Sequence, residues 1–141
     1  MGNKIKDDLY FFLLRFLFGF MYFFVHGLPK IKGGPETWAK IGKATGYIGI
    51  NVFPTFFGFM ASISEFLGGL LLMLGLFIRP ASFFIALTMI VAIFYHFGRG
   101  DSLLGASHAI ENFIVILFIF LKGSDSFSLE RKFKSFFTNR L

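Results

Sequence analysis

The sequence predicts an all-α integral membrane protein: a four-helix bundle with a short interfacial helix after the first span and a C-terminal amphipathic helix. Hydrophobic residues fill 55% of the 141 positions, the mean hydropathy is +0.71, and only 16% of the residues are charged. Soluble domains carry about 25% charged residues. Four apolar segments approach or exceed the length of about 20 residues that crosses a bilayer as a helix. A single membrane domain, residues 1–141, is therefore expected.

The four spans are expected at about 9–26, 54–78, 80–97 and 103–121. A polar leader, residues 1–8, precedes the first span. We expect this span to be an uncleaved helix, because Arg15 interrupts the apolar run and no small-residue cleavage site follows it. The second and third spans should form an antiparallel hairpin that turns at Arg79 and Pro80, since their connection is very short.

Two segments outside the spans also have helical patterns. Pro35 and Glu36 are typical of a helix start, with proline at the first position and an acid in the first turn. They predict either a short interfacial helix anchored by Trp38 or an irregular surface loop. In the tail, residues 128–141, apolar positions recur at helical spacing among basic residues. This pattern predicts an amphipathic helix on an anionic membrane surface, with a partner-binding segment as the alternative.

The distribution of basic residues predicts how the chain lies in the membrane. Four crossings place both termini on one side, together with eight Lys and Arg residues against five on the other side. The positive-inside rule therefore favours cytoplasmic termini. The basic residues lie at the ends of apolar runs, where lipid headgroups are, so the net charge of +6 does not indicate nucleic-acid binding.

Each predicted span carries one stripe of small or polar residues on an otherwise apolar surface. The spacing of three or four residues places each stripe on one helical face. Lipid solvates polar groups poorly, so the four stripes are expected to face one another and form a site inside the bundle. The stripes are Arg15, Gly19, Tyr22 and His26; Gly58, Ser62, Glu65 and Gly69; Thr88, Ala92 and His96; and His108, Glu111 and Asn112.

Buried charges make this site costly. An unpaired charge at the centre of a membrane helix costs about 2.5–3.5 kcal/mol. We therefore expect Arg15 to form a buried ion pair with Glu65 or Glu111. Counting helix rise from the termini, the three histidines should gather toward the opposite face of the membrane. The alternative is that these residues only hold the helices together.

The cofactor chemistry is constrained by what the chain lacks. It has no cysteine, which excludes disulfides, dithiol redox chemistry and Cys-ligated iron–sulfur clusters. It has no nicotinamide or flavin motif, so a redox role requires a quinone, another bound cofactor or a partner subunit. His108 and Glu111 form an i, i+3 pair of the kind found in helix-bundle metal sites. The chain has only one such pair, so metal or haem binding is an alternative and not the main prediction.

Several segments resemble, in order, the DoxX family: Arg15, residues 26–30 (HGLPK), 64–81 (SEFLGGLLLMLGLFIRPA), 88–96 (TMIVAIFYH), Glu111 and 126–130 (SFSLE). The resemblance covers nearly the whole chain. It implies a multi-pass four-helix protein of the bacterial inner membrane. Some members are similar to the small membrane subunit of a thiosulfate:quinone oxidoreductase. The chain departs from the family pattern in the tail, where Gly123, Ser124 and Asp125 stand in place of the Gly-Pro-Gly that is common in family members.

Taken together, the residues and the resemblance predict a quinone-linked oxidoreductase subunit. A quinone head needs hydrogen-bonding groups at its carbonyls and a proton source when it is reduced. Electrons would come from a partner redox subunit or a small reductant, and a homo-oligomer is a further expectation. The alternative is a non-enzymatic assembly factor, anchor or small-molecule binder. The candidate catalytic residues are Glu65, His96 and Glu111, and the candidate ligand-binding residues are Arg15, His26, Lys30 and His108.

Overall fold

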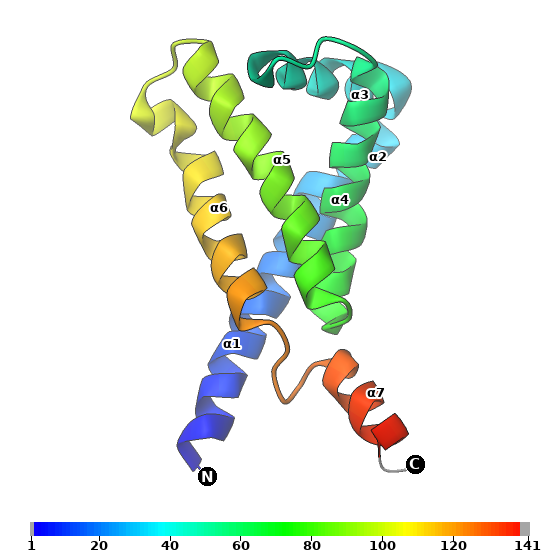
Figure 1. Ribbon diagram of the computed structural model, residues 1–141, viewed down its shortest axis with the longest axis vertical. Helices are drawn as coiled ribbons and strands as arrows, with labels where there is room; N and C mark the ends of the chain where they lie inside the picture. Colours follow the sequence, from blue (N-terminus) through cyan, green and yellow to red (C-terminus); the bar gives the residue numbers. More distant parts are fainter. Residues whose placement is uncertain (1, 139–141) are drawn as a thin grey trace.

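Every described element of the computed structural model is helical (Figure 1). The structure describes the backbone of residues 2–138 and the side chains of residues 4–135. Four helical segments are long and apolar enough to cross a membrane: Lys4–Lys32, Pro54–Leu74, Ile78–Gly98 and Leu103–Lys122. This confirms the predicted fold class. The elements are α1 Gly2–Phe20, η1 Met21–Gly27, α2 Leu28–Lys32, α3 Gly34–Gly42, η2 Lys43–Ile48, α4 Pro54–Leu74, α5 Ile78–Gly98, α6 Leu103–Lys122 and α7 Leu129–Thr138.

The first helical segment is longer than predicted at both ends. It begins at Gly2, includes residues of the polar leader, and continues through the π-helix η1 and through α2. At its start Asp8 is only 7% exposed, and its carboxylate accepts hydrogen bonds from the backbone N–H and hydroxyl of Ser126. Near its end, a Cβ on Gly27 would lie 2.4 Å from backbone atoms of Phe66 in α4. Both ends are helical because they pack against the rest of the bundle.

The hairpin between α4 and α5 turns earlier than predicted. α4 ends at Leu74, and α5 already begins at Ile78, so residues 75–77 form the hinge. Gly75 ends α4 in the left-handed conformation, with φ +70°, as helix-terminating glycines commonly do. Pro80 lies in the first turn of α5, where its missing N–H leaves no intrahelical bond unmade. The predicted turn at Arg79 and Pro80 was therefore wrong by a few residues.

α4 is the central helix of the bundle. It packs against α1, η1, α2, α3 and α5, whereas α6 packs mainly against α5. The backbone of α1 approaches α4 closely, because a Cβ on Gly19 would lie 2.7 Å from the carbonyl oxygen of Gly69. The buried core lies where these helices meet and includes Leu72, Ile85 and Ile116. Most large apolar side chains elsewhere on the helices are exposed, as expected of a surface that faces lipid.

The predicted helix after the first span is confirmed as α3, followed by the 3₁₀ turn η2. The Trp38 ring packs against Phe59 of α4 at 4.9 Å, and its Nε1 donates to the carbonyl oxygen of Lys30 at 2.9 Å. The Tyr47 ring of η2 packs against Tyr95 of α5. We call this end of the molecule, with α2, α3, η2 and the α5–α6 turn, the distal end (Figure 1).

The opposite end holds the start of α1, the hinge, residues 123–128 and α7, and we call it the terminal end (Figure 1). The predicted tail helix is confirmed over Leu129–Thr138, while residues 139–141 of that prediction lie outside the described chain. The backbone N–H of Glu130 donates to the carbonyl oxygen of Gly75 at 3.0 Å. This bond ties α7 to the hinge. The contact of α7 with a membrane surface stays a prediction.

Candidate functional site

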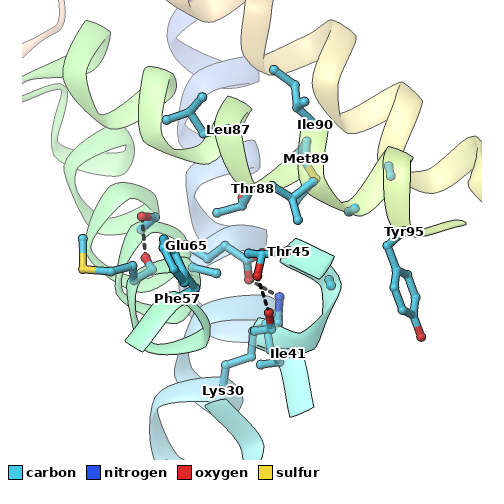
Figure 2. A pocket seen from close by; sticks show the side chains of 18 of the residues that line it. Lys30, Ile41, Thr45, Phe57, Glu65, Leu87, Thr88, Met89, Ile90 and Tyr95 are labelled. Carbon is cyan, nitrogen blue, oxygen red and sulfur yellow. Dashed lines mark hydrogen bonds and ion pairs between the residues drawn. The ribbon is translucent and has the colours of Figure 1, made fainter. Parts of the chain in front are cut away.

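A cavity of about 810 Å³ lies in the distal half of the bundle. α5 forms one wall, and η1, α3, η2 and α4 form much of the other (Figure 2). Its size is within the range of about 300–1,000 Å³ that is typical of small-molecule sites. Apolar side chains make up most of the lining, among them Ile41, Phe57, Leu87 and Met89. The polar residues that line it are Tyr22, His26, Lys30, Lys40, Thr45, Ser64, Glu65, Thr88, Tyr95, His96 and His108.

An ion pair between Lys30 and Glu65 forms part of the wall of this cavity. Lys30 Nζ lies 2.5 Å from Glu65 Oε2, and the two side chains are 30% and 3% exposed. Figure 2 shows Lys30 reaching toward Glu65, with Thr45 beside the pair. The pair forms because α2 continues the first helix past Gly27 and carries Lys30 over the middle of α4. Glu65 is therefore neutralised from the distal end, and its predicted pairing with Arg15 is wrong.

Three aromatic rings line up beside this pair. Tyr22 is 2% exposed, its ring centroid lies 5.3 Å from that of His26, and His26 lies 5.5 Å from His108 of α6. Within the described side chains, the Tyr22 hydroxyl forms no hydrogen bond, so it can donate to a molecule in the cavity. His26, His108 and His96 all reach the same cavity. The expected gathering of the histidines toward the end opposite the termini is confirmed.

His96 is held by the turn between α5 and α6. Its Nδ1 lies 2.8 Å from Asp101 Oδ2, and both side chains are about one-third exposed. The acid fixes the ring, so Nε2 is the nitrogen left to meet a ligand. Next to it, Arg99 donates to the hydroxyl of Tyr95, and this hydrogen bond raises the pKa of the guanidinium. The positive charge of Arg99 thus lies beside Tyr95, which lines the cavity.

Glu111 is not brought into the cavity. It lies exposed on α6, while His108, one turn earlier, reaches the lining. Asn112 donates to the carbonyl oxygen of His108 at 2.7 Å instead of facing another span. The fourth stripe faces inward only in part: α6 packs mainly on α5, and it buries Ala109 and Ile116 while Glu111 lies exposed. Across the described side chains, no three His, Asp or Glu residues lie close enough to hold a metal ion.

Arg15 forms a separate buried site at the terminal end. Its Nε lies 2.9 Å from Asp125 Oδ2, and both side chains are fully buried. Nη1 donates to the carbonyl oxygens of Leu72 and Met73 near the end of α4. The prediction of a buried ion pair was right, but its partner is neither Glu65 nor Glu111. The loop after α6 folds beneath the bundle, and this brings Asp125 into contact with Arg15.

Two residues of these sites were missed from the sequence. Tyr22 was placed on the polar stripe of the first span but was not expected to bind a ligand. Asp125 enters the sequence-based prediction only as part of the departure from the common Gly-Pro-Gly. One signal could have indicated it: Asp125 follows the last residue of the fourth span by three positions. Asp125 therefore lies at the same end of the bundle as Arg15, whose buried guanidinium requires an acidic partner.

The Lys30–Glu65 pair should respond unequally to the loss of either partner. Lys30→Met strands a buried carboxylate and should lower the free energy of unfolding by about 1–3 kcal/mol. Glu65→Gln leaves a partly exposed lysine that can reach water or headgroups, so its effect should be smaller. Unfolding by SDS in mixed micelles, followed by circular dichroism, measures both. Lys32→Met, an exposed lysine of α2, is the control, and equal losses for all three variants would contradict the pairing.

The geometry can now be compared with known proteins. A profile of the DoxX family matches residues 10–98, which is more than half of the chain. The matched range contains most of the first span, the whole second and third spans, and both members of the Lys30–Glu65 pair. No curated protein and no solved structure matches the chain. Because the match covers most of the bundle, this membrane protein belongs to the DoxX family.

Proposed function

We propose that this DoxX protein is a quinone-linked oxidoreductase subunit of the bacterial inner membrane, and that the distal cavity binds the quinone head. The observation that carries the proposal is an apolar cavity among membrane-spanning helices whose lining contains the Lys30–Glu65 ion pair, with its carboxylate buried, and the side chain of Tyr22. Ligand sites typically have this character, an apolar lining with a few polar groups that fix the orientation of the ligand.

The chemistry of a quinone head fits these groups. The head is a flat, largely apolar ring with a carbonyl oxygen at each end. Lys30 and Tyr22 can donate hydrogen bonds to one oxygen, and His96 can donate to the other. Phe57 and Met89 supply apolar contacts for the faces of the ring.

Reduction of a quinone to a quinol consumes two electrons and two protons. The electrons would come from a partner redox subunit or from a small reductant such as thiosulfate. Glu65 and the histidines are the groups of this chain that can pass protons to the two oxygens. Glu111 lies outside the cavity, so it has no part in this proposal.

The charge distribution supports an orientation with cytoplasmic termini. The distal cavity then lies in the half of the bilayer away from the cytoplasm. A partner redox subunit or a second copy of the chain would meet this protein within the membrane or at either surface. A non-enzymatic binder of a small amphiphile would use the same cavity without turnover.

Reconstitution tests the proposal directly. Purified protein should carry quinone in its lipid extract, and proteoliposomes should reduce quinone with thiosulfate. Glu65→Gln should lower the rate about 100-fold if the carboxylate transfers a proton. Glu111→Gln, which changes an exposed acid of α6 outside the cavity, is the matched control and should keep the wild-type rate. Bound quinone without turnover would favour the non-enzymatic binder, and the absence of both bound quinone and activity would contradict the quinone-linked role.

A further inference from the structure

A second hollow of about 370 Å³ follows the seam between α4 and α5. It shares Met60, Ser64 and Phe84 with the distal cavity, so the two hollows adjoin at these residues. Beyond them its lining is almost wholly apolar, and it ends at the hinge. The residues that line only this groove include Ile63, Leu67, Leu71, Phe77, Pro80 and Ala81.

The groove runs along the membrane span and opens sideways. From Met60 to Leu71 the rise of α4 is about 16 Å, directed from the distal cavity toward the terminal end. Leu67 and Phe84 on its edges are 45% and 49% exposed, which places the opening on the surface that faces lipid. Gly68 deepens the groove, since a Cβ there would lie only 3.0 Å from Cδ1 of Ile85.

Because the groove adjoins the cavity and is almost wholly apolar, we infer that the ligand of the distal cavity is an amphiphile with one long apolar chain. Its head occupies the cavity, and its chain lies in the α4–α5 groove. The ligand enters sideways from the bilayer, between α4 and α5. The inference rests on the proposed function and narrows the substrate to long-chain membrane quinones, as opposed to short-chain quinones that enter from water.

The groove is expected to govern access more than affinity. Lipid chains are as apolar as the groove lining, so moving a chain from bilayer to groove removes little surface from water. Without the groove, however, a head in the cavity would force its attached chain against packed helices. Wild-type protein should therefore bind quinones with and without a chain equally well when their concentrations within the membrane are equal. A blocked groove should reject only the quinone that carries a chain.

Leu67→Trp is the variant that blocks the groove, because Leu67 lines the groove but not the head cavity. Leu74→Trp is the matched control on the same helix: Leu74 is 43% exposed and lines neither hollow. The full chain in nanodiscs is titrated with a chainless benzoquinone and with the same head bearing a long isoprenoid chain. In Leu67→Trp the Kd of the long-chain quinone should rise about tenfold or more, while that of the chainless quinone stays within about twofold.

A photoreactive group at the end of the isoprenoid chain gives a second readout. In wild-type protein it should cross-link residues 63–84. That result supports the inference even where tryptophan at position 67 turns toward lipid and leaves both Kd values unchanged. Cross-links confined to α1 or α6 would overturn it. So would cross-linking of the groove by a photoreactive phosphatidylglycerol that long-chain quinone does not displace, since the groove would then hold a bilayer lipid. If the chainless quinone fails to bind wild-type protein, the proposed function itself fails.

Discussion

Arg15→Leu is expected to lower the free energy of unfolding by about 3–5 kcal/mol. The variant leaves the carboxylate of Asp125 fully buried without its cation, and it removes the hydrogen bonds to the end of α4. SDS unfolding in mixed micelles, followed by circular dichroism, measures the loss. The loop after α6 should loosen first, because Asp125 is its buried anchor.

A double variant separates this ion pair from a general packing effect. Asp125→Asn keeps an oxygen that can accept from the N–H of Phe127 and removes the charge. Combined with Arg15→Leu, it should recover much of the lost stability, since no unpaired charge remains. Glu65→Gln and Glu111→Gln should bring no such recovery. Recovery with either glutamate variant, but not with Asp125→Asn, would contradict the observed pairing.

Gly58→Ala is expected to detach α3 from α4. A Cβ at this position would lie 1.7 Å from the carbonyl oxygen of Trp38, and backbone atoms cannot turn aside as a side chain can. Overpacking of this kind costs about 1–3 kcal/mol or more. α3 carries Ile41 on the cavity wall, so quinone binding should weaken together with stability.

Trp38 reports this change without labelling, because it is the only tryptophan of the chain. Its ring packs on Phe59 in the native bundle, so detachment should shift its fluorescence to the red. Gly105→Ala at the start of α6 is the control, where the nearest contact of the added Cβ is a side-chain atom 3.2 Å away. An unshifted emission in Gly58→Ala with native stability would show that α3 and α4 are not so closely packed.

The sequence predicts the bundle well because a bilayer leaves few alternatives. Backbone polar groups in lipid must be satisfied within each segment, so long apolar runs become helices. The stripes on the first and second spans, from Arg15 to His26 and from Gly58 to Gly69, do face the interior. Helix ends were less predictable. Gly75 ends α4 through its backbone conformation, and the leader is helical, with Asp8 hydrogen-bonded to Ser126 of the loop after α6.

The partners of the charges could not be predicted from spacing on single helices. Spacing places Arg15 and Glu65 on inward faces, but it does not show that a loop or a helix extension supplies the opposite charge. Lys30 reaches Glu65 because α2 prolongs the first helix, and Asp125 reaches Arg15 because the loop after α6 folds back. Glu111 shows the converse case. A polar residue in a span need not face inward when its helix packs on one neighbour.

Quenching of Trp38 by a chainless quinone tests the central claim, that the cavity at Lys30 and Glu65 binds a quinone head. Trp38 donates a hydrogen bond to the carbonyl oxygen of Lys30, so a quinone bound beside this pair lies close to the only tryptophan. Wild-type protein and Glu111→Gln should show the same saturable quenching. In Glu65→Gln the concentration for half-saturation should rise about tenfold. Quenching that grows linearly with quinone, and equally in all three proteins, would show only collisions in the bilayer and would contradict the claim.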